Sequence, residues 1–449
     1  MKITRLMLDN VRAIEEAEFT FNPGFNLIIG INGAGKSTVL DAIRYCGSHL
    51  LYNLLPRMPF KPFGFGVDDI HSKAPFAEAA LHLSFSDTGD AFVRLREWRE
   101  QVAGESIENT ERLRREILET ARPRDRLRNQ LRELQESVSP AESVFFYPSK
   151  SDLIARANRE TSIPLMIHYS TARSIMNERS GRKSAAGTIQ LAYVNALQSN
   201  ALSLRQFAVW MRAQMGLASE RPASRYLVKG ISAALERFLP GYSNLRPSTE
   251  NASRVEIDIR GTTVDVRQLS DGERSALVLI VDIAKRLAQA NPQLDDPLTS
   301  AQAVILIDEI DLHLHPQWQR RVVTNLEETF PRCQFIATTH SPQIIGETQP
   351  ERLILLQAEE GRIVPRRCGQ AYGLDANAVL ELIMGTASRA EPARRAIAGV
   401  EAALDEGELG KARTNLAELR RLIHGDDPTV AGLEAAINNL EALGDATNQ

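Results

Sequence analysis

The sequence predicts an α/β fold, in which a mixed sheet is flanked by helices and followed by an α-helical tail. Two N-terminal segments, residues 3–8 and 17–21, alternate apolar and polar residues as half-buried strands do. Residues 25–29 form a nearly unbroken apolar run, which suits the centre of a sheet, and a glycine-rich loop and a helix follow it. Far downstream, the apolar strands predicted at 304–307 and 334–339 also end in polar residues. Strands joined to helices in this way are typical of α/β domains.

Further elements follow in order along the chain. The same strand patterns recur at residues 78–85, 92–96, 164–169, 255–259, 263–266, 353–357 and 362–365. Helices are predicted from residue 37 onward, in the region before about 240, over 275–287 and throughout the tail from 375. In the tail, Asp427 and Pro428 form an N-cap and first-turn pair, after which Leu433, Ile437 and Leu440 form one apolar stripe.

Residues 100–145 differ from their surroundings because they are charged and rich in arginine. Apolar residues recur there at helical spacing, and Pro123 separates two such stretches, so we predict a short helical-hairpin insertion with its tip near residues 122–126. The predicted domains are an N-terminal lobe at 1–99, the hairpin at 100–145, a C-terminal lobe at 146–374 and a helical C-terminal domain at 375–449.

Composition narrows the class of protein. A formal net charge of −4 over 449 residues carries no global signature of nucleic-acid binding, so any DNA contact must be a local patch. The three cysteines are widely spaced and form no CxxC pair, which argues against disulfides or a structural zinc and favours a reducing cytoplasm. The N-terminus has no apolar signal core, and the longest apolar run, at 276–284, is interrupted by Asp282. We therefore expect a cytoplasmic protein without a membrane partner.

The segment Gly30–Thr38 predicts a phosphate-binding loop. Its glycines lie between an apolar strand and a helix, and backbone amides in such a turn cradle phosphate oxygens. Lys36 is expected to reach the β- and γ-phosphates, and Ser37 to ligate Mg²⁺. ATP and Mg²⁺ are thus the predicted cofactors. The predicted nucleotide contacts in this loop are Asn32, Gly33, Gly35, Lys36, Ser37 and Thr38.

Acidic residues and a histidine follow the two downstream strands. Asp308, at the end of the strand at 304–307, suits the Mg²⁺ shell through water, and Glu309 is placed to polarise the attacking water as general base. His340 follows the strand at 334–339. We interpret His340 as a sensor of the γ-phosphate, in preference to a structural histidine.

A second anion site is predicted at Leu269–Arg274, here called the signature, because these residues precede the long apolar helix at 275–287. Ser270, with Gly272 and Glu273, is expected to contact nucleotide there. One subunit has no use for two such sites so far apart in sequence. We therefore expect two copies to pair head to tail as a dimer, or within a higher oligomer, with the signature of one copy covering the γ-phosphate bound by the other.

Asp311, His313 and His315 alternate in a pattern that allows two interpretations. They form either a separate zinc site or a loop at the dimer face that links the two ATP sites. We prefer the loop.

Together these motifs resemble the ABC-type P-loop ATPase heads of the SMC, RecF and OLD-like superfamily. The matching segments are Asn10–Arg12, Gly30–Thr38, Leu269–Arg274, Asp308–Pro316 and Thr339–Pro342. The run Leu306–Gln319 is more specific and looks like the stand-alone ATPases of anti-phage defence, among them the Septu ATPase subunit (PtuA), which is also found beside some retrons. The resemblance covers about residues 1–100, 160–175 and 250–385.

The resemblance implies ATP hydrolysis and adds one contact, Arg12, near the base or ribose. Two departures from the superfamily pattern stand out. No glutamine of the Q-loop kind is recognisable after the strand at 164–169, where Arg173 could take a related place. The tail also lacks the Asp-x-Asp strand end of a Toprim nuclease, so we expect no intrinsic nuclease activity.

The resemblance implies an ATP-driven switch and sensor subunit that controls a separate effector, such as an HNH nuclease, in an anti-phage defence complex. The trigger would be DNA or phage-derived, and the hairpin and tail would dock the effector. The alternative is a RecF-like repair or recombination ATPase that clamps DNA. A transporter subunit is disfavoured because the signature reads Asp-Gly-Glu-Arg after Ser270.

Overall fold

The computed structural model describes most of the chain as two compact units, Met1–Leu374 and Asp375–Gln449. The described residues are all except 56–59, 73, 86–88, 99–143, 148–149, 158–163, 172–173, 177–188, 199–200, 252–253, 360–361 and 448–449. The predicted hairpin at 100–145 therefore lies almost wholly outside the described residues. In the part that is described, no helix is long and apolar enough to cross a membrane.

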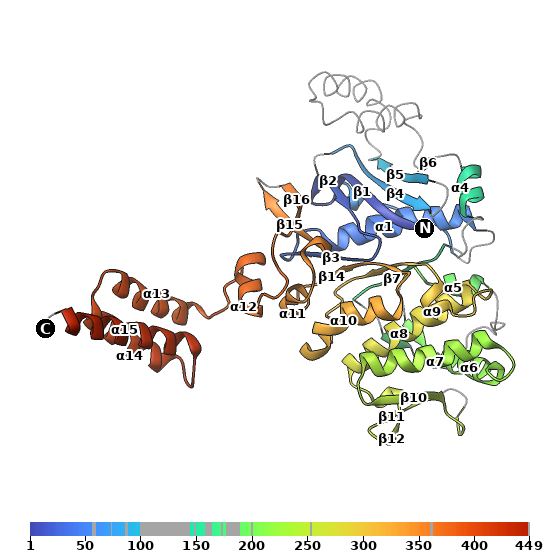
Figure 1. Ribbon diagram of the computed structural model, residues 1–449. Coiled ribbons are helices and arrows are strands. Elements are labelled where there is room, and N and C mark those ends of the chain that lie inside the picture. The colour runs from blue at the N-terminus through green and yellow to red at the C-terminus, as the bar shows by residue number, and fades with distance from the viewer. Residues whose placement is uncertain are drawn as a thin grey trace. The chain divides into compact units, whose positions relative to one another are not determined.

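A six-stranded mixed sheet forms the centre of the first unit (Figure 1). Its order is β16 (Arg362–Arg367), β15 (Leu353–Glu359), β3 (Phe25–Gly30), β14 (Gln334–Thr338), β13 (Val304–Ile307) and β7 (Met166–Tyr169). All neighbours are parallel except β16, which is antiparallel to β15. β3, β13, β14 and β7 are fully buried, as their apolar sequences require. Polar residues after parallel strands consequently meet at one edge.

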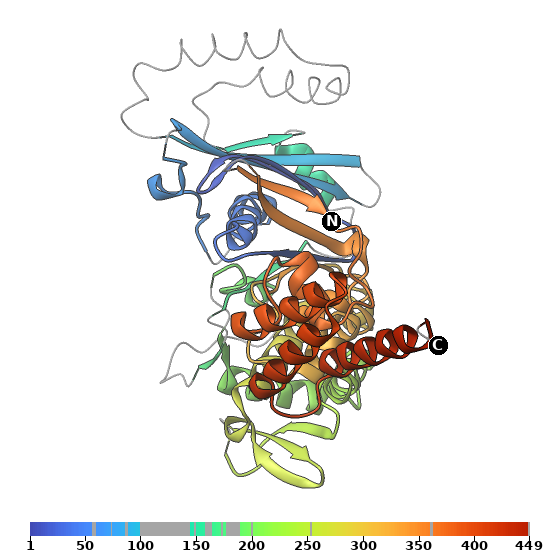
Figure 2. The same cartoon turned by 90° about the vertical axis from the view of Figure 1, so that its left-hand side faces the viewer.

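A second sheet of five antiparallel strands lies beside the first. Its order is β2 (Ile14–Thr20), β1 (Lys2–Val11), β4 (Phe76–Phe85), β5 (Gly89–Trp98) and β6 (Val144–Tyr147). Helix α1 (Lys36–Leu54) runs between the two sheets, as Figure 2 shows, and contacts strands of both. Its approach to β7 is so close that a Cβ at Gly47 would lie 2.2 Å from the Met166 Sδ. This packing fixes the start of α1 relative to the parallel strand ends.

Helices cover the other face of the six-stranded sheet (Figure 1). They are α5 (Gln190–Tyr193), α6 (Leu204–Leu217), α7 (Pro222–Phe238), α8 (Asp271–Ala290), α9 (Pro297–Ser300) and α10 (Pro316–Thr329). The short helices α4 (Lys150–Ala157) and α11 (Pro342–Gly346) also belong to this unit. Helix α8 is buried along most of its length, which explains its almost uninterrupted apolar sequence.

Small sheets join these helices. A three-stranded antiparallel sheet consists of β10 (Tyr242–Pro247), β11 (Val255–Ile259) and β12 (Thr262–Asp265), and a parallel pair of β8 (Ser174–Met176) and β9 (Ala201–Ser203). The sequence did not predict β10, because most of this edge strand is exposed and its apolar residues do not alternate. The two-stranded pair likewise interrupts a region that we expected to be helical.

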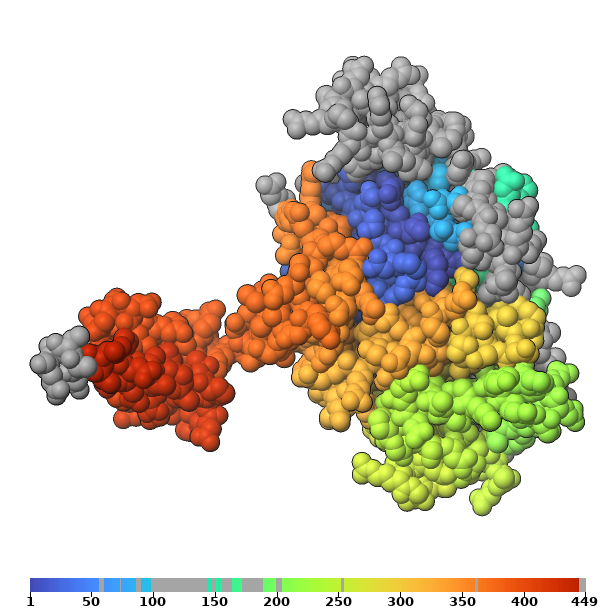
Figure 3. Space-filling model, in the orientation of Figure 1, coloured from blue at the N-terminus to red at the C-terminus, as the bar shows by residue number. Residues whose placement is uncertain are grey.

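Segments far apart in sequence build this unit jointly. β3 from the N-terminal part pairs with β14 and β15, so the lobes predicted at 1–99 and 146–374 share one sheet. In the space-filling view, the blue N-terminal residues and the orange residues that follow β14 form one continuous surface (Figure 3). The first unit is therefore a single structural body.

The second unit, Asp375–Gln449, is helical and has its own core. Its helices are α12 (Ala376–Ala378), a π-helical turn at Val379–Ile383, α13 (Glu391–Asp405), α14 (Leu409–Leu422) and α15 (Pro428–Thr447). The buried core residues are Val400, Ala403, Ala412, Leu416, Leu419, Val430, Leu433 and Ile437. Asp427 caps α15, since its Oδ1 accepts bonds from the backbone amides of Thr429 at 2.9 Å and Val430 at 3.2 Å. Leu440 is 42% exposed, so the predicted apolar stripe ends at Ile437.

These observations confirm the predicted fold class: a mixed sheet flanked by helices, with a helical tail.

Candidate functional site

The loop between β3 and α1 has the backbone of a phosphate cradle. Gly33 and Gly35 have φ values of 80° and 85°, which residues with a Cβ rarely adopt. A Cβ at Gly30 would lie 2.8 Å from the Leu356 carbonyl oxygen, so this position also needs glycine. Gly35 is the N-cap of α1, and no side chain caps this helix. The first amides of a 19-residue helix are thus available to an anion.

Lys36 lies inside the loop. Its Nζ donates hydrogen bonds to the carbonyl oxygens of Gly30 and Ile31, both at 2.9 Å, so the ammonium is held at the centre of the cradle. Burial lowers the pKa of Lys36, while the charges of Asp308 and Glu309 act in the opposite direction. A buried ammonium among glycine amides fits the phosphates of a nucleotide, because it supplies charge where water is excluded.

The Asp308 carboxylate gathers three segments. It accepts hydrogen bonds from the Ser37 Oγ at 3.1 and 3.3 Å and from the Thr338 Oγ1 at 2.6 Å. The residues therefore come from the ends of β13 and β14 and from the start of α1, as the parallel register requires. A hydroxyl and a carboxylate at this spacing are hard oxygen donors, which fit Mg²⁺ bound together with phosphates.

Glu309 has a left-handed backbone, with φ 47°. Its amide donates to the Thr338 Oγ1 at 2.8 Å, so one threonine side chain contacts both Asp308 and Glu309. Such a conformation costs about 1–3 kcal/mol in a residue with a Cβ and is concentrated at active sites. The strained turn directs the chain away from β13 immediately after Asp308.

His340 lies beside the same carboxylates. Its backbone amide donates to the Asp311 Oδ1 at 3.3 Å, and the Thr339 Oγ1 donates to the same oxygen at 2.5 Å. Burial lowers the pKa of His340, and Lys36 lowers it further, while Asp311 and other carboxylates oppose this shift. At neutral pH the imidazole is therefore uncharged and can either donate or accept a hydrogen bond.

The alternating residues after Glu309 have structural partners. Asp311 holds Thr339 and the His340 amide as described. His315 is the N-cap of α10, with its Nδ1 accepting from the Gln317 amide at 3.3 Å. His313 has a left-handed backbone, with φ 63°. Nowhere in the described part of the chain do three or more His, Cys, Asp or Glu side chains form a group that could hold a metal ion.

The signature segment begins α8. Ser270 is the N-cap: its Oγ accepts from the Glu273 amide at 3.4 Å, and the Glu273 carboxylate accepts from the Ser270 amide at 2.7 Å. Glu273 also accepts a hydrogen bond from the Tyr242 hydroxyl. The Glu273 carboxylate is thus engaged within its own chain, and its predicted contact with nucleotide stays a prediction. No hydrogen bond or ion pair between described residues joins 269–274 to the phosphate loop.

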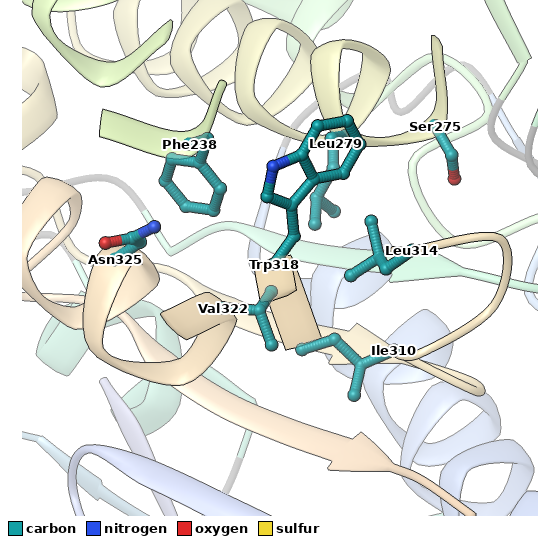
Figure 4. A pocket seen from close by; sticks show the side chains of 9 residues that line it. Phe238, Ser275, Leu279, Ile310, Leu314, Trp318, Val322 and Asn325 are labelled. Atoms are coloured by element: carbon teal, nitrogen blue, oxygen red, sulfur yellow. The ribbon is translucent and has the colours of Figure 1, made fainter. Parts of the chain in front are cut away.

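Gly272 brings the signature against the segment that follows Glu309. A Cβ at Gly272 would lie 2.2 Å from the His313 carbonyl oxygen. The Trp318 ring would lie 3.9 Å from the same Cβ, and it packs among Phe238, Leu279 and Leu314 (Figure 4). The hollow there measures about 20 Å³, which is far too small for a nucleotide. The contact between Gly272 and His313 therefore fixes the signature relative to the C-terminal end of β13.

Arg12 is bound by two carboxylates. Its Nε donates to Asp69 at 2.7 Å and its Nη1 to Asp41, on α1, at 3.0 Å. Burial acts to lower the pKa of Arg12, but the hydrogen bonds and charges of Asp69 and Asp41 raise it above its ordinary value. The predicted contact of Arg12 with the base or ribose stays a prediction. Arg173 lies outside the described residues.

Sequence reasoning identified most of these positions but missed the role of Thr338. The hydroxyl of Thr338 joins Asp308 to the Glu309 amide. A signal was present, because Thr338 directly follows the apolar run Phe335–Ala337 at the end of the strand.

Comparisons with known proteins relate the chain to ATPases. The family model described as "AAA domain, putative AbiEii toxin, Type IV TA system" matches residues 59–346, and one described as "AAA ATPase domain" matches residues 1–89. The "Retron Ec83 probable ATPase" of Escherichia coli is 25% identical over 406 residues, which are 80% of this chain and 72% of that protein. The "Septu protein PtuA" of Bacillus thuringiensis is 22% identical over 440 residues, or 95% of each chain. These relatives confirm the resemblance to Septu and retron ATPases.

Among solved structures, the Smc head bound to the C-winged helix domain of ScpA aligns with a TM-score of 0.44 and 16% identity. The alignment covers 82% of this chain and 98% of that one.

Gly272→Ala tests whether the close contact with His313 is required. The added methyl group must displace backbone, so we expect a loss of about 1–3 kcal/mol in the free energy of unfolding, together with slower ATP turnover. Gly216→Ala is the matched control, because Gly216 is in α6 with open space around it, and alanine there should stabilise by about 0.5–1 kcal/mol. Thermal unfolding and a phosphate-release assay measure both variants. Equal melting temperatures for Gly272→Ala and the unaltered protein would show that the close contact between Gly272 and His313 does not require glycine.

Proposed function

We propose a function for this chain from the family to which it belongs, the AAA-domain family described as "AAA domain, putative AbiEii toxin, Type IV TA system". The chain is an ATPase. We propose that it acts as a nucleotide-driven switch, in which two copies close on ATP and the closed state controls a separate effector protein. The observation that carries the proposal is the cluster of Lys36, Ser37, Asp308 and Thr338, to which no hydrogen bond or ion pair among the described residues joins Leu269–Arg274 directly.

In this proposal, each side chain of the cluster has one task. Bound ATP and Mg²⁺ supply the scissile phosphoanhydride bond and the charge that polarises it. Lys36 and the loop amides of Asn32–Thr38 orient the phosphates, and Ser37 and Asp308 hold the cation. Glu309 orients and deprotonates the attacking water, while the neutral His340 imidazole contacts the γ-phosphate.

The proposed dimer follows from the position of Ser270. Its helix N-terminus is a second anion site, and no hydrogen bond or ion pair among the described residues ties it to the phosphate loop of its own chain. A second copy arranged head to tail would bring Ser270 and Gly272 onto the γ-phosphate bound by the first copy. ATP then bridges two protein surfaces, and its hydrolysis removes the bridge.

The relatives support a place in anti-phage defence. A Septu PtuA protein aligns over nearly the whole of this chain, and a retron ATPase over most of it. We propose that the effector is a nuclease of the HNH type and that the trigger is DNA or a phage product. The second unit is a suitable docking element, because it has a core of its own. It has 13 acidic and 7 basic residues, a net charge of −6, which suits the basic surface of a DNA-cutting partner.

Glu309→Gln tests the proposed dimer of two copies that ATP holds together, which we call the clamp. The variant should bind ATP, turn it over about 10²–10⁴-fold more slowly, and accumulate as a dimer held by ATP, because the bridge is no longer cleaved. Light scattering with and without ATP measures the mass. Lys36→Ala is the control, since it removes the ammonium from the cradle and should neither bind ATP nor dimerise. A Glu309→Gln protein that binds ATP and stays monomeric contradicts the clamp.

Purification of the unaltered protein from its own host tests the proposed identity of the effector. Mass spectrometry of the co-purifying proteins should identify a nuclease or a reverse transcriptase, and ATP should change the amount recovered. Recovery of recombination or replication proteins instead would overturn the defence assignment and favour the RecF-like alternative.

A further inference from the structure

The chain needs a physical link between its nucleotide site and its signature helix, and the Q-loop glutamine expected for this purpose is not recognisable. The structure contains a buried polar connection at the same place. Tyr169, the last residue of β7, lies directly beside Ile307 of β13 in the parallel register. It is fully buried. Its main chain and its side chain contact different parts of the molecule.

The main chain of Tyr169 contacts the nucleotide site. Its carbonyl oxygen accepts a hydrogen bond of 2.8 Å from the amide of Asp308, the residue whose carboxylate binds Ser37. This hydrogen bond provides a route by which a displacement of Asp308 would reach the end of β7. Because β7 is at the edge of the sheet, it can move without disturbing a further strand.

The side chain of Tyr169 contacts the signature helix. Its hydroxyl donates to the Oδ2 of Asp282, on α8, at 2.9 Å. Arg286, one turn further along α8, donates from Nε to the same oxygen at 2.6 Å. Arg286 also donates from Nη1 to the carbonyl oxygens of Ala192 and Val194, at 2.6 and 3.0 Å. One buried carboxylate oxygen therefore joins β7 to α8, and Arg286 extends the connection to the segment around α5.

The energetics of this cluster indicate that it positions α8 and adds little to the stability of the fold. Asp282 and Arg286 are 4% and 8% exposed, and a buried ion pair gains little over apolar residues of the same volume. Burial opposes the shift, but the charge of Asp282 raises the pKa of Arg286. Such a pair fixes one geometry, because any displacement leaves a charge unpaired in the interior. It holds α8 against Tyr169 in a defined register.

Helix α8 extends the connection to the signature. Asp282 lies twelve positions after the N-cap Ser270, which corresponds to about 18 Å of straight helix. Asp271–Ala290 form one continuous α-helix, so a displacement near Asp282 would be carried along the helix towards Ser270. A shift at Tyr169 consequently moves the helix end that carries Ser270 and Gly272.

We infer that Tyr169, through Asp282 and Arg286, is a positioning residue that couples the nucleotide state at Asp308 to the placement of the signature at Ser270. The inference rests on the proposed clamp, because it is the signature that meets the second copy. Removal of the Tyr169 hydroxyl leaves ATP binding by one copy intact and weakens closure of two copies.

Tyr169→Phe in the Glu309→Gln chain tests the coupling, since it removes only the hydroxyl. ATP affinity of the monomer is measured with a fluorescent ATP analogue at low protein concentration, and dimerisation by light scattering over a range of ATP concentrations. We expect unchanged monomer affinity and a midpoint for dimerisation raised about tenfold, the equivalent of one hydrogen bond worth about 1.4 kcal/mol.

Tyr193→Phe is the matched control. Tyr193 is 1% exposed, and its hydroxyl donates to the Pro164 carbonyl oxygen at 2.8 Å instead of to α8. It should leave the dimerisation midpoint unchanged. If Glu309→Gln alone fails to dimerise, the clamp is wrong. If it dimerises, and Tyr169→Phe has the same midpoint or Tyr193→Phe shifts it equally, the coupling is wrong.

Hydrogen exchange on the Glu309→Gln protein gives a second readout that does not depend on a variant of Tyr169. At a protein concentration that keeps it monomeric, ATP should change the exchange of α8 amides near Asp282. Exchange that is the same with and without ATP at these amides overturns the coupling, even where Tyr169→Phe lowers the melting temperature.

Discussion

The Asp308 carboxylate is the point on which the nucleotide site depends, because it accepts hydrogen bonds from the start of α1 and from the end of β14. Its own amide is bound by β7, and the next residue is held by Thr338. These contacts form only if β7, β13, β14 and β3 end at one edge in register. The parallel sheet is thus the scaffold that aligns the phosphate loop with the carboxylates.

A second constraint acts on the signature. The close contact between Gly272 and His313 holds the start of α8 against the segment after Glu309. The buried carboxylate of Asp282 holds the same helix against β7. Two separate contacts therefore define where α8 lies relative to Asp308. This arrangement allows a change at the nucleotide to reach a surface that, in the proposed clamp, belongs to the other half of the site.

Local patterns predicted the parts of the molecule that local physics determines. The apolar run before Gly30, the glycines of the loop, and the Asp427 cap were all recognisable, because backbone geometry and burial restrict the residue types there. Thr338, Tyr169 and Asp282 were not, since their roles arise from register between distant segments. The edge strand β10 was not predicted and Leu440 was wrongly placed in the core. Both are at least partly exposed to solvent, where apolar and polar residues are both accommodated and the sequence pattern is weak.

Site-specific cross-linking between two protomers tests whether ATP joins the phosphate loop of one copy to the signature of the other. One tagged copy carries Asn32→Cys and the other Asp271→Cys, both at exposed positions, in a Glu309→Gln chain with Cys368→Ser; the remaining cysteines, Cys46 and Cys333, are buried. Pairing of the phosphate loop of one copy with the signature of the other predicts a covalent heterodimer that forms only with ATP. Cross-linking that forms equally without ATP, or no cross-linking in a protein that binds ATP, would contradict the ATP-held dimer.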